Sequence, residues 1–499
     1  MSEGERATRR ARLEALREKG IDPYPARVGP REAIAVVRSR FGEQSAEALE
    51  VDPQTVAVVG RIVAVRSFGK LVFVRLLEAG ETIQVSVRRQ EIDAELFDWI
   101  RSFDVGDFVR IEGPVWRTRT GELTVDAKAA QILAKSLRPL PEKWHGLTDV
   151  ESRFRQRYLD LLSNEQARRI AVLRSRTLSA MRAFLDARGF LEVETPVLQP
   201  IYGGAAARPF DTHHRRYDQK LYLRISDELY LKRLVVGGLD RVYEIGHNFR
   251  NEGISRKHNP EFTMMECYQA YADYRDMMDL SEEMIREIAE RVCGTTRIEY
   301  QGTTLDFGAP WRRVPMRDAI RDATGIDVLE HGDLEALSGA MRGRGLEPSD
   351  APTWARLVDD LFSDRVEPDL VQPTLVSDYP LDLSPLAKRS VEDARLVERF
   401  EPFVAGMEIG NAFSELNDPD DQRARLEQQR RALAAGDEEA HPLDEDYVMA
   451  LEHGLPPTGG LGIGVDRLVM ILADVPNLRE VILFPHLRPI APDGAPEEP

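Results

Sequence analysis

Charged and amide side chains crowd residues 249–262, FRNEGISRKHNPEF, between two apolar runs that look like strands. The pattern predicts a hairpin with an unusually long, cationic connection. Arg250 is suited to bidentate contact with a phosphate or carboxylate, and the loop cations could neutralise the outer phosphates of a nucleotide. Phe262 could stack on a purine. An exposed charged loop is the ordinary interpretation of such a run on its own.

The return strand of this hairpin, FTMMECYQ, alternates in a way that adds to the site. Side chains two residues apart share one face of a strand, so Phe262, Met264, Glu266 and Tyr268 are expected to lie together. An aromatic platform for adenine would then be continuous with a carboxylate and a phenol.

A second segment, EPFVAGMEIGNAFSELND, offers more polar groups on alternate positions. Asn411, Phe413 and Glu415 share one face, whereas strict alternation places Glu408 on the opposite one. A bulge at Gly410 would bring Glu408 to the same side, because glycine tolerates the backbone of a bulge.

Phosphate and metal binding are the chemistry that these segments suggest. Glu401 and Glu408 are natural Mg²⁺ ligands, since Mg²⁺ takes one or two carboxylates together with phosphate oxygens. Arg467 follows a glycine-rich strand at the start of a helix, where an anion is favoured. The sequence contains no G-x-x-x-x-G-K-[ST] and no G-x-G-x-x-G after a strand. We therefore predict a nucleotide site on an antiparallel sheet.

The elements that must position these groups suggest an α+β chain. Residues 6–20 and 31–50 look helical within an N-terminal segment 1–50. Residues 51–133 contain five short strand patterns with one helical stretch, as in an OB-fold barrel. On the barrel, Phe73 could stack on a base, and Gln84 and Glu122 could bond to base edges. The alternative is that Phe73 belongs to the barrel core and the other two residues are ordinary surface.

The rest of the chain reads as a linker, 134–147, and a large domain, 148–490, with a mostly helical insertion near 316–365 and a disordered tail, 491–499. Strands joined largely by hairpins and long helices favour an antiparallel sheet flanked by helices over a doubly wound one. Asp227 is expected to cap the helix that begins ELYLKRL.

Composition limits the function classes. The net charge is −18 and mean hydropathy is −0.37, with no window approaching a membrane span. The net negative charge argues against non-specific binding to nucleic acid over the whole surface. Two cysteines, Cys267 and Cys293, are too few for a disulfide framework and are interpreted as packing residues. A cytoplasmic location without membrane contact is expected.

Together these segments resemble a known family. FLEVETP, FRNEGISRKHNPEFTMMECYQAYADY and GLGIGVDRLVMIL resemble the three signature motifs of class II aminoacyl-tRNA synthetases. IYGGAAARPF, DELYLKRLVVGG, SDYPLDLSPLAK and MEIGNAFSELND resemble the lysine-specific bacterial branch. The resemblance runs from about residue 5 to 490. It implies an OB-fold anticodon-binding domain and a class II catalytic domain, both acting on tRNA.

The resemblance also implies roles for individual residues. Catalysis would rest on Arg250 and Arg467, and Glu401 and Glu408 would carry Mg²⁺. The residues implied in ATP binding are Arg250, Glu252, His258, Asn259, Phe262, Glu401, Glu408 and Arg467. Those implied in lysine binding are Gly204, Glu228, Arg250, Glu266, Tyr268, Asn411, Phe413 and Glu415. Phe73, Gln84 and Glu122 would read the anticodon, in place of the core-and-surface alternative.

The implied reaction is ATP-dependent ligation of lysine to tRNA(Lys) through an adenylate, by a homodimer. An aspartate or asparagine enzyme of the same architecture is a competing interpretation, although Glu228 and Glu415 would repel an acidic substrate. A catalytically silent tRNA-binding or regulatory paralogue is another. The chain departs from the family at His247, where an arginine is usual, and at Cys267, which should point away from the site.

Overall fold

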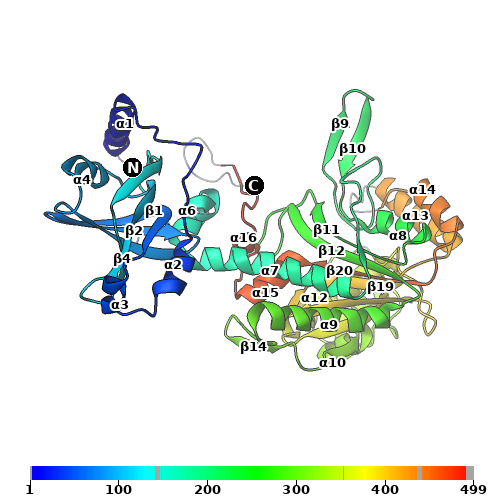
Figure 1. The fold of residues 1–499 in the computed structure, drawn as a ribbon. Coiled ribbons are helices and arrows are strands. Elements are labelled where there is room, and N and C mark those ends of the chain that lie inside the picture. The colour runs from blue at the N-terminus through cyan, green and yellow to red at the C-terminus, as the bar shows by residue number, and fades with distance from the viewer. Residues whose placement is uncertain (1–2, 141–146, 148, 352, 435–440, 490–499) are drawn as a thin grey trace. The chain divides into compact units, whose positions relative to one another are not determined.

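The computed structural model describes residues 3–140, 147, 149–351, 353–434 and 441–489 (Figure 1). The chain divides into two compact units, Met1–Gly146 and Leu147–Pro499. The predicted tail, 491–499, and residues 141–146 of the predicted linker lie outside the described residues.

The first unit is a small β-barrel with short helices. Its elements are α1 (Glu3–Glu18), α2 (Ile34–Phe41), α3 (Ala46–Val51), β1 (Thr55–Phe68), β2 (Leu71–Glu78), β3 (Glu81–Arg88), α4 (Ala94–Arg101), β4 (Phe108–Arg117), β5 (Leu123–Asp126) and β6 (Ala129–Ala134). The strand order is β1-β2-β3-β5-β4-β6, and β1 also pairs with β4. That extra pairing closes the barrel and confirms the predicted OB architecture.

One expected helix and one expected strand of this unit are each divided into two elements in the structure. The helix expected over 31–50 begins only at Ile34 and stops at Gly42; Ser45, whose hydroxyl accepts from the Ala48 amide, starts a second helix. The last of the five strand patterns, ELTVDAKAAQIL at 122–133, breaks between β5 and β6. Gly113 of β4 faces the break, and a Cβ there would lie 1.8 Å from the Asp126 carbonyl oxygen. Val115 pairs with Val125 and Glu112 with Ala129, so three residues, 126–128, face two, 113 and 114. The Ala127 amide donates to the Ser86 carbonyl of β3 at 2.8 Å, and this bulge interrupts the ladder with β4.

The second unit contains the remaining elements. Up to the insertion they are α5 (Val150–Arg155), α6 (Arg157–Ser163), α7 (Glu165–Ala187), β7 (Leu191–Glu192), β8 (Leu198–Gln199), β9 (Asp211–His214), β10 (Gln219–Leu223), α8 (Glu228–Val236), β11 (Arg241–Phe249), β12 (Glu261–Ala270), α9 (Tyr274–Cys293), β13 (Arg297–Tyr300), β14 (Thr303–Asp306) and β15 (Arg312–Pro315). From the insertion onward they are α10 (Met316–Thr324), α11 (Leu334–Gly343), α12 (Trp354–Arg365), β16 (Thr374–Pro380), β17 (Leu396–Val404), β18 (Met407–Glu408), β19 (Gly410–Ser414), α13 (Pro419–Ala434), α14 (Glu445–Glu452), β20 (Thr458–Gly464), α15 (Val465–Ala473) and α16 (Leu478–Val481), with short 3₁₀ turns at Glu367–Asp369 and Leu381–Leu383.

A nine-stranded sheet organises this unit, in the order β15-β16-β17-β19-β20-β12-β11-β7, with β18 beside β17. The strands from β16 to β11 pair antiparallel, and only the outermost pairs, β15 with β16 and β7 with β11, are parallel. This confirms the predicted antiparallel α+β class rather than a doubly wound sheet.

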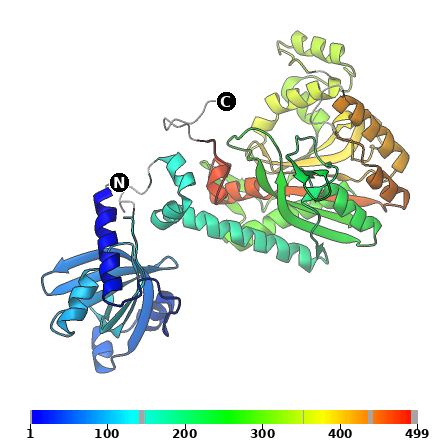
Figure 2. The same ribbon diagram turned by 90° about the horizontal axis from the view of Figure 1, so that it is seen from above.

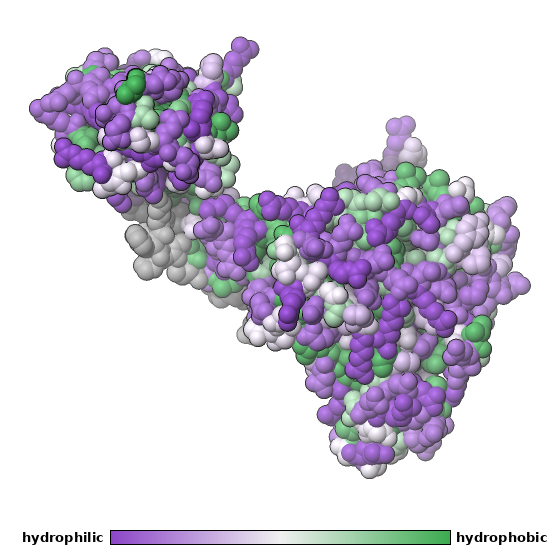
Figure 3. Space-filling model, turned by 60° about the horizontal axis from the view of Figure 1, so that its bottom comes forward, coloured by the Kyte–Doolittle hydropathy of each residue, from purple (hydrophilic) through white to green (hydrophobic). Residues whose placement is uncertain are grey.

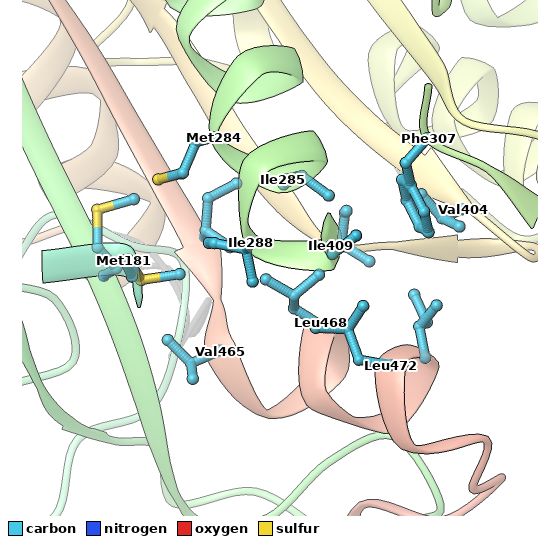
Figure 4. Packing of buried hydrophobic residues seen from close by; sticks show 14 of the residues in the cluster. Met181, Met284, Ile285, Ile288, Phe307, Val404, Ile409, Val465, Leu468 and Leu472 are labelled. Carbon is cyan, nitrogen blue, oxygen red and sulfur yellow. The ribbon is translucent and has the colours of Figure 1, made fainter. Parts of the chain in front are cut away.

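One face of the sheet packs on a hydrophobic core that includes residues of α7, α9 and α15, part of which is shown in Figure 4. Met284 and Ile288 of α9 and Leu468 of α15 are fully buried there. Helix α9 is defined at both ends: Asp273 and Asp276 form a reciprocal capping box, and Gly294 ends the helix with φ of 77°. This core therefore holds the sheet on the face that is covered by α7, α9 and α15.

Strand β12 divides its side chains between this core and the other face. Met265 and Cys267 are fully buried in the core, which confirms that Cys267 points away from the site. Met264, Glu266 and Tyr268 lie on the opposite face and line a cavity. Alternation along one strand therefore connects the hydrophobic core to the polar site.

The insertion, 316–365, consists of α10, α11 and α12, which are drawn in yellow-green in Figure 2. Their apolar residues, among them Ile320, Leu337 and Phe362, join a second core with residues of α8 and α14. Polar residues dominate the face seen in Figure 3. No helix in the described part of the chain has the length and apolar character needed to cross a membrane.

Candidate active site

A cavity of about 350 Å³ opens on the face of the sheet opposite the α7–α9–α15 core. Its walls come from the β11–β12 hairpin, the β17–β19 region, β20 and the first turn of α15. Every residue predicted to contact ATP or lysine lines it: Gly204, Glu228, Arg250, Glu252, His258, Asn259, Phe262, Glu266, Tyr268, Glu401, Glu408, Asn411, Phe413, Glu415 and Arg467. Residues more than 260 positions apart are thus collected in one place, as the sequence patterns suggested.

Arg250 stands where β11 ends and the cationic loop begins. Its backbone amide donates to the Pro260 carbonyl at 2.8 Å, which closes the loop. Its guanidinium carbon lies 5.0 Å from the centre of the Phe262 ring, within cation–π range. Burial lowers the pKa of Arg250, partly offset by Glu252 and Glu408. Its Nε has no partner among the described residues, so a donor is free to meet an anion.

Arg467 occupies the first turn of α15 and faces Glu408. One nitrogen donates to the Glu408 carbonyl at 2.7 Å and to its carboxylate at 3.1 Å. The other lies 3.2 Å from His258 Nε2. Because burial, and then Arg467, lowers the pKa of His258, the imidazole is neutral and accepts at Nε2, with Nδ1 2.9 Å from Ser255 Oγ. Arg467 thereby connects Glu408 of β18 and His258 of the hairpin loop.

Glu401 and Glu408 both face the cavity, as the magnesium hypothesis requires. Tyr379 donates to Glu401 at 2.8 Å, and Arg399 donates to its other oxygen at 2.5 Å. Burial raises the pKa of Glu401 to about 7, with Arg399 opposing it. The described residues contain no group of three or more potential metal-ligating side chains. A divalent cation would therefore need phosphate oxygens to complete its coordination.

The bulge expected near Gly410 is present. Phe403 pairs with Glu408, whereas Phe400 pairs with Ala412. Three residues, 409–411, therefore face two, 401 and 402, and the extra residue turns Glu408 and Asn411 toward the same cavity. Gly410 allows the close approach, because a Cβ would lie 2.5 Å from the Gly462 carbonyl oxygen.

The inner end of the cavity is acidic. Glu228 begins α8 and Glu415 follows β19, and both are buried. Burial raises the pKa of both carboxyls, although Lys232 opposes the shift. Lys232 Nζ lies 2.5 Å from Glu228 Oε1 and forms an ion pair with Glu415 Oε2. Tyr268 places its ring beside this pair.

A third carboxylate, Glu266, lies between the acidic end and the arginines. Ser226 donates to it at 3.0 Å and the Tyr268 hydroxyl donates to its other oxygen at 3.1 Å. Burial raises its pKa well above the usual range. Gly204, with φ of 90°, passes close by, and a Cβ there would lie 2.7 Å from Ser226 Oγ. The backbone of this loop is thereby brought next to Glu266.

Strand β20 supplies a floor made of backbone. Gly460 and Gly462 face the cavity. A Cβ on Gly460 would lie 2.1 Å from Glu415 Oε1 and 2.6 Å from the Tyr268 ring. Glycine is required at 460 because any side chain would fill the acidic end.

The structure adds residues that the sequence reasoning missed. Arg399 bonds Asn411 at 2.8 Å and Glu401, and Lys232 bridges the two buried carboxylates. Signals existed for both: Arg399 and Glu401 share a strand face, and Lys232 follows Glu228 at helix spacing i, i+4.

One local prediction was wrong. The Asp227 side chain does not cap α8 but accepts from the Asn248 amide at 2.9 Å. Ser226 Oγ accepts from the Glu228 amide at 3.1 Å in its place. A tertiary partner on β11 outcompeted the local cap.

The predicted nucleic-acid residues lie on the outer surface of the barrel. Along β2, Val72 and Val74 are buried and Phe73 between them is half-buried, so Phe73 is not a core residue. Gln84 bonds Thr124 at 3.0 Å and Glu122 bonds Arg75 at 3.3 Å. Because Arg75 pairs with Gln84, two residues from Phe73 on the same face, the three predicted residues share one side of the barrel.

Comparison with known proteins gives matches along both units. A family profile described as tRNA synthetases class II (D, K and N) matches residues 149–488. A second, described as an OB-fold nucleic acid binding domain, matches residues 56–133. A lysine–tRNA ligase of Chloroflexus aurantiacus is 54% identical over 97% of this chain and 98% of its own length. Lysine–tRNA ligases of a Roseiflexus species and of Staphylococcus aureus are 55% and 48% identical, each over 96% of this chain and at least 97% of their own lengths.

Proposed function

The chain belongs to the class II tRNA synthetases of the aspartate, lysine and asparagine group, and we propose that it is the ligase that joins L-lysine to tRNA(Lys) with ATP. The observation that carries this function is a cavity with Glu228 and Glu415 buried at one end and Arg250 and Arg467 at the other. The acidic end suits the ammonium of lysine, and the arginines suit the two anions that must react.

The first step forms a lysyl-adenylate. A carboxylate oxygen of lysine attacks the α-phosphorus of ATP, and the bond from that phosphorus to the pyrophosphate oxygen breaks. In this proposal Arg250 contacts both the α-phosphate and the lysine carboxylate, which holds two mutually repelling anions in line. No enzyme base is needed, since the nucleophile is already ionised.

ATP is proposed to lie along the β11–β12 hairpin. Adenine would stack between Phe262 and Arg467, with the amides and imidazole of the hairpin loop around it. His258 would contact ATP as a neutral imidazole, beside the cationic Arg467. The remaining proposed contacts are Glu252 and Asn259.

Glu401 and Glu408 would hold Mg²⁺ together with the phosphates of ATP. Two carboxylates that face the cavity suit an ion that prefers few protein oxygens and several phosphate or water oxygens. When bound, the ion would neutralise phosphate charge as pyrophosphate leaves. Arg399 and Tyr379 keep Glu401 oriented toward the cavity.

Lysine is proposed to lie with its side chain toward Glu228, Glu415 and Tyr268. Its α-amino group would meet Glu266 and the backbone of Gly204. Asn411 would help to hold the carboxylate, with Phe413 packing along the chain. An acidic end of this kind disfavours aspartate and asparagine, because the buried carboxylates would be left unpaired or opposed by a like charge.

The second step transfers lysine from the adenylate to a hydroxyl of the terminal ribose of tRNA, releasing AMP. Phe73 would stack on an anticodon base, while Gln84 and Glu122 would bond base edges. Their common position on the outer face of the barrel supports this role.

A homodimer in the cytoplasm is part of the proposal. The edge strand β7 and the start of β8 carry exposed apolar side chains, with Leu191 51% and Leu198 49% exposed, and Val172 of α7 is 50% exposed. An exposed apolar group next to an unpaired strand edge favours association with a second copy. A catalytically silent paralogue would be expected to lose its arginines and acidic pair, and all are present.

Lysine-dependent exchange of labelled pyrophosphate into ATP tests the function. We expect exchange with lysine and not with aspartate or asparagine, and its loss in Arg250→Ala. Arg216→Ala, which removes an exposed arginine from the turn between β9 and β10, is the matched control and should leave exchange intact. Folded protein that shows no exchange with any amino acid would overturn the assignment.

A further inference from the structure

Lys232 is a buried cation in the place where the substrate cation is expected. It lies on the inner side of α8 with no exposed surface, four residues after Glu228. Its Nζ is 2.5 Å from Glu228 Oε1, forms an ion pair with Glu415 Oε2, and lies 5.2 Å from the centre of the Phe413 ring. The two carboxylates assigned to the substrate ammonium are therefore already joined by an ammonium of the protein.

The titratable groups around Lys232 are compatible with a positive charge on its side chain. Burial acts to lower the pKa of Lys232, but Glu228 and Glu415 outweigh it and raise the pKa. His441, which precedes α14, is neutral because burial, and then Lys232, lowers its pKa to about 4. Burial raises the pKa of Tyr447 on α14, so it too is neutral. Arg399 and Asp227 act on Glu228 from further away, with opposite signs.

One carboxylate oxygen remains available in this arrangement. Glu415 Oε1 is buried and has no hydrogen-bond partner among the described residues. It points toward Gly460, where a Cβ would lie 2.1 Å away, and both residues line the cavity. An unpartnered buried oxygen of this kind is costly unless a ligand satisfies it.

We propose that Lys232 is a built-in counter-ion, which leaves the Glu228–Glu415 pair short of neutrality by one positive charge and thereby selects a substrate side chain with a single positive charge. Two carboxylates and one ammonium sum to one negative charge, and the lysine side chain completes the balance. This deepens the proposed function and rests on the assignment of Glu228 and Glu415 to the substrate ammonium.

The counter-ion has a second effect, on competition with protons. Two neighbouring buried carboxylates without a cation hold a proton more tightly, since like charges disfavour joint ionisation. A bound proton excludes the substrate ammonium from the oxygen that it occupies. Lys232 opposes this effect, because its charge lowers the pKa of Glu228 and of Glu415 relative to burial alone.

Lys232→Met, which keeps the length of the side chain and removes its charge, tests the proposal. The readout is kcat/KM for lysine in pyrophosphate exchange as a function of pH. We expect the acid inflection of this profile to move to higher pH, lowering kcat/KM at neutral pH about tenfold for each unit of the move. The KM for ATP should not change. Lys220→Met, at a lysine that is 59% exposed on β10, should leave the profile in place.

A double variant separates charge from packing. In Lys232→Met/Glu415→Gln one carboxylate is removed along with the cation, so Glu228 no longer has a like charge beside it. The acid inflection of the double variant should therefore lie at a lower pH than that of Lys232→Met. A uniform loss at every pH in Lys232→Met, with no return in the double variant, would mean that Lys232 only packs and would overturn the proposal. Wild-type protein without lysine-dependent exchange would instead overturn the proposed function itself. Retained ATP-dependent thermal stabilisation reports that each variant is folded.

Discussion

Arg467 donates to Glu408 twice, to its backbone carbonyl at 2.7 Å and to its carboxylate at 3.1 Å. The bonds join the first turn of α15 to the strand that carries a proposed magnesium ligand. In the proposed binding mode, one guanidinium therefore contacts both the adenine and the residue that would hold Mg²⁺ beside the phosphates. Removing it should disturb both.

For Arg467→Ala we expect kcat in pyrophosphate exchange to fall roughly a hundred- to a thousandfold, the usual effect of losing a donor that stabilises developing charge. The KM for ATP should rise, whereas the KM for lysine should change little. Arg467→Lys should recover only part of the activity, because an ammonium cannot reproduce the planar fork of donors. Unchanged ATP kinetics in the alanine variant would contradict the proposed position of ATP.

Gly460→Ala should act on lysine alone. The added methyl would lie 2.1 Å from Glu415 Oε1 and 2.6 Å from the Tyr268 ring, within the acidic end of the cavity. We expect the KM for lysine to rise about tenfold or more, with ATP binding retained, in line with the cost of overpacking a closed site. Gly339→Ala, inside α11 where a Cβ would meet nothing within 4 Å, is the control and should stabilise the fold by up to about 1 kcal/mol.

Activity with lysine should depend on acid titration of the carboxyl pair. Burial raises the pKa of Glu228 and Glu415, and the ammonium of lysine binds their ionised forms. Lysine affinity is therefore full above the raised pKa and is lost as the pH falls through it, by about tenfold per unit for one proton. Plots of kcat/KM for lysine against pH, with ATP saturating, should bend in this direction, and a rise on acidification would refute the assignment.

Phe73→Ala should separate the two steps of the reaction. The cavity is untouched, so lysine-dependent pyrophosphate exchange should stay at the wild-type level. Losing one stacked base costs about 1–3 kcal/mol, so kcat/KM for tRNA in aminoacylation should fall roughly tenfold or more. Discrimination against tRNA with an altered anticodon should fall too. Val51→Ala, at an 86% exposed residue of the same unit, is the comparison variant.

Short-range patterns predicted much of this molecule because each depended on one element. The alternation of Met264, Glu266 and Tyr268 needed only a strand, and the bulge near Gly410 needed only a glycine between Glu408 and Asn411. The OB barrel followed from closely spaced strands interrupted by one helix. In each case the local preference agreed with the tertiary fold.

The missed features depend on contacts between distant segments. Asp227 is a good helix cap by type, but Asn248 on β11 takes its carboxylate. The spacing of Lys232 from Glu228 indicates a local ion pair, but the burial of Lys232 and its ion pair with Glu415 depend on the tertiary fold. The strand after Glu122 divides at a bulge, where the Ala127 amide donates to Ser86 of β3 rather than to β4. No local rule carries information about such partners.

The backbone floor at Gly460 and Gly462 also limits how this site can be redesigned. No substitution at these two positions can enlarge the cavity, because glycine has no side chain to shorten. Room for bulkier lysine derivatives must therefore come from the neighbouring strands, where Tyr268 on β12 and Phe413 on β19 pair with Gly460 and carry aromatic rings that smaller groups can replace. A substitution of either glycine adds a side chain to the cavity, so it can only reduce the number of amino acids that fit.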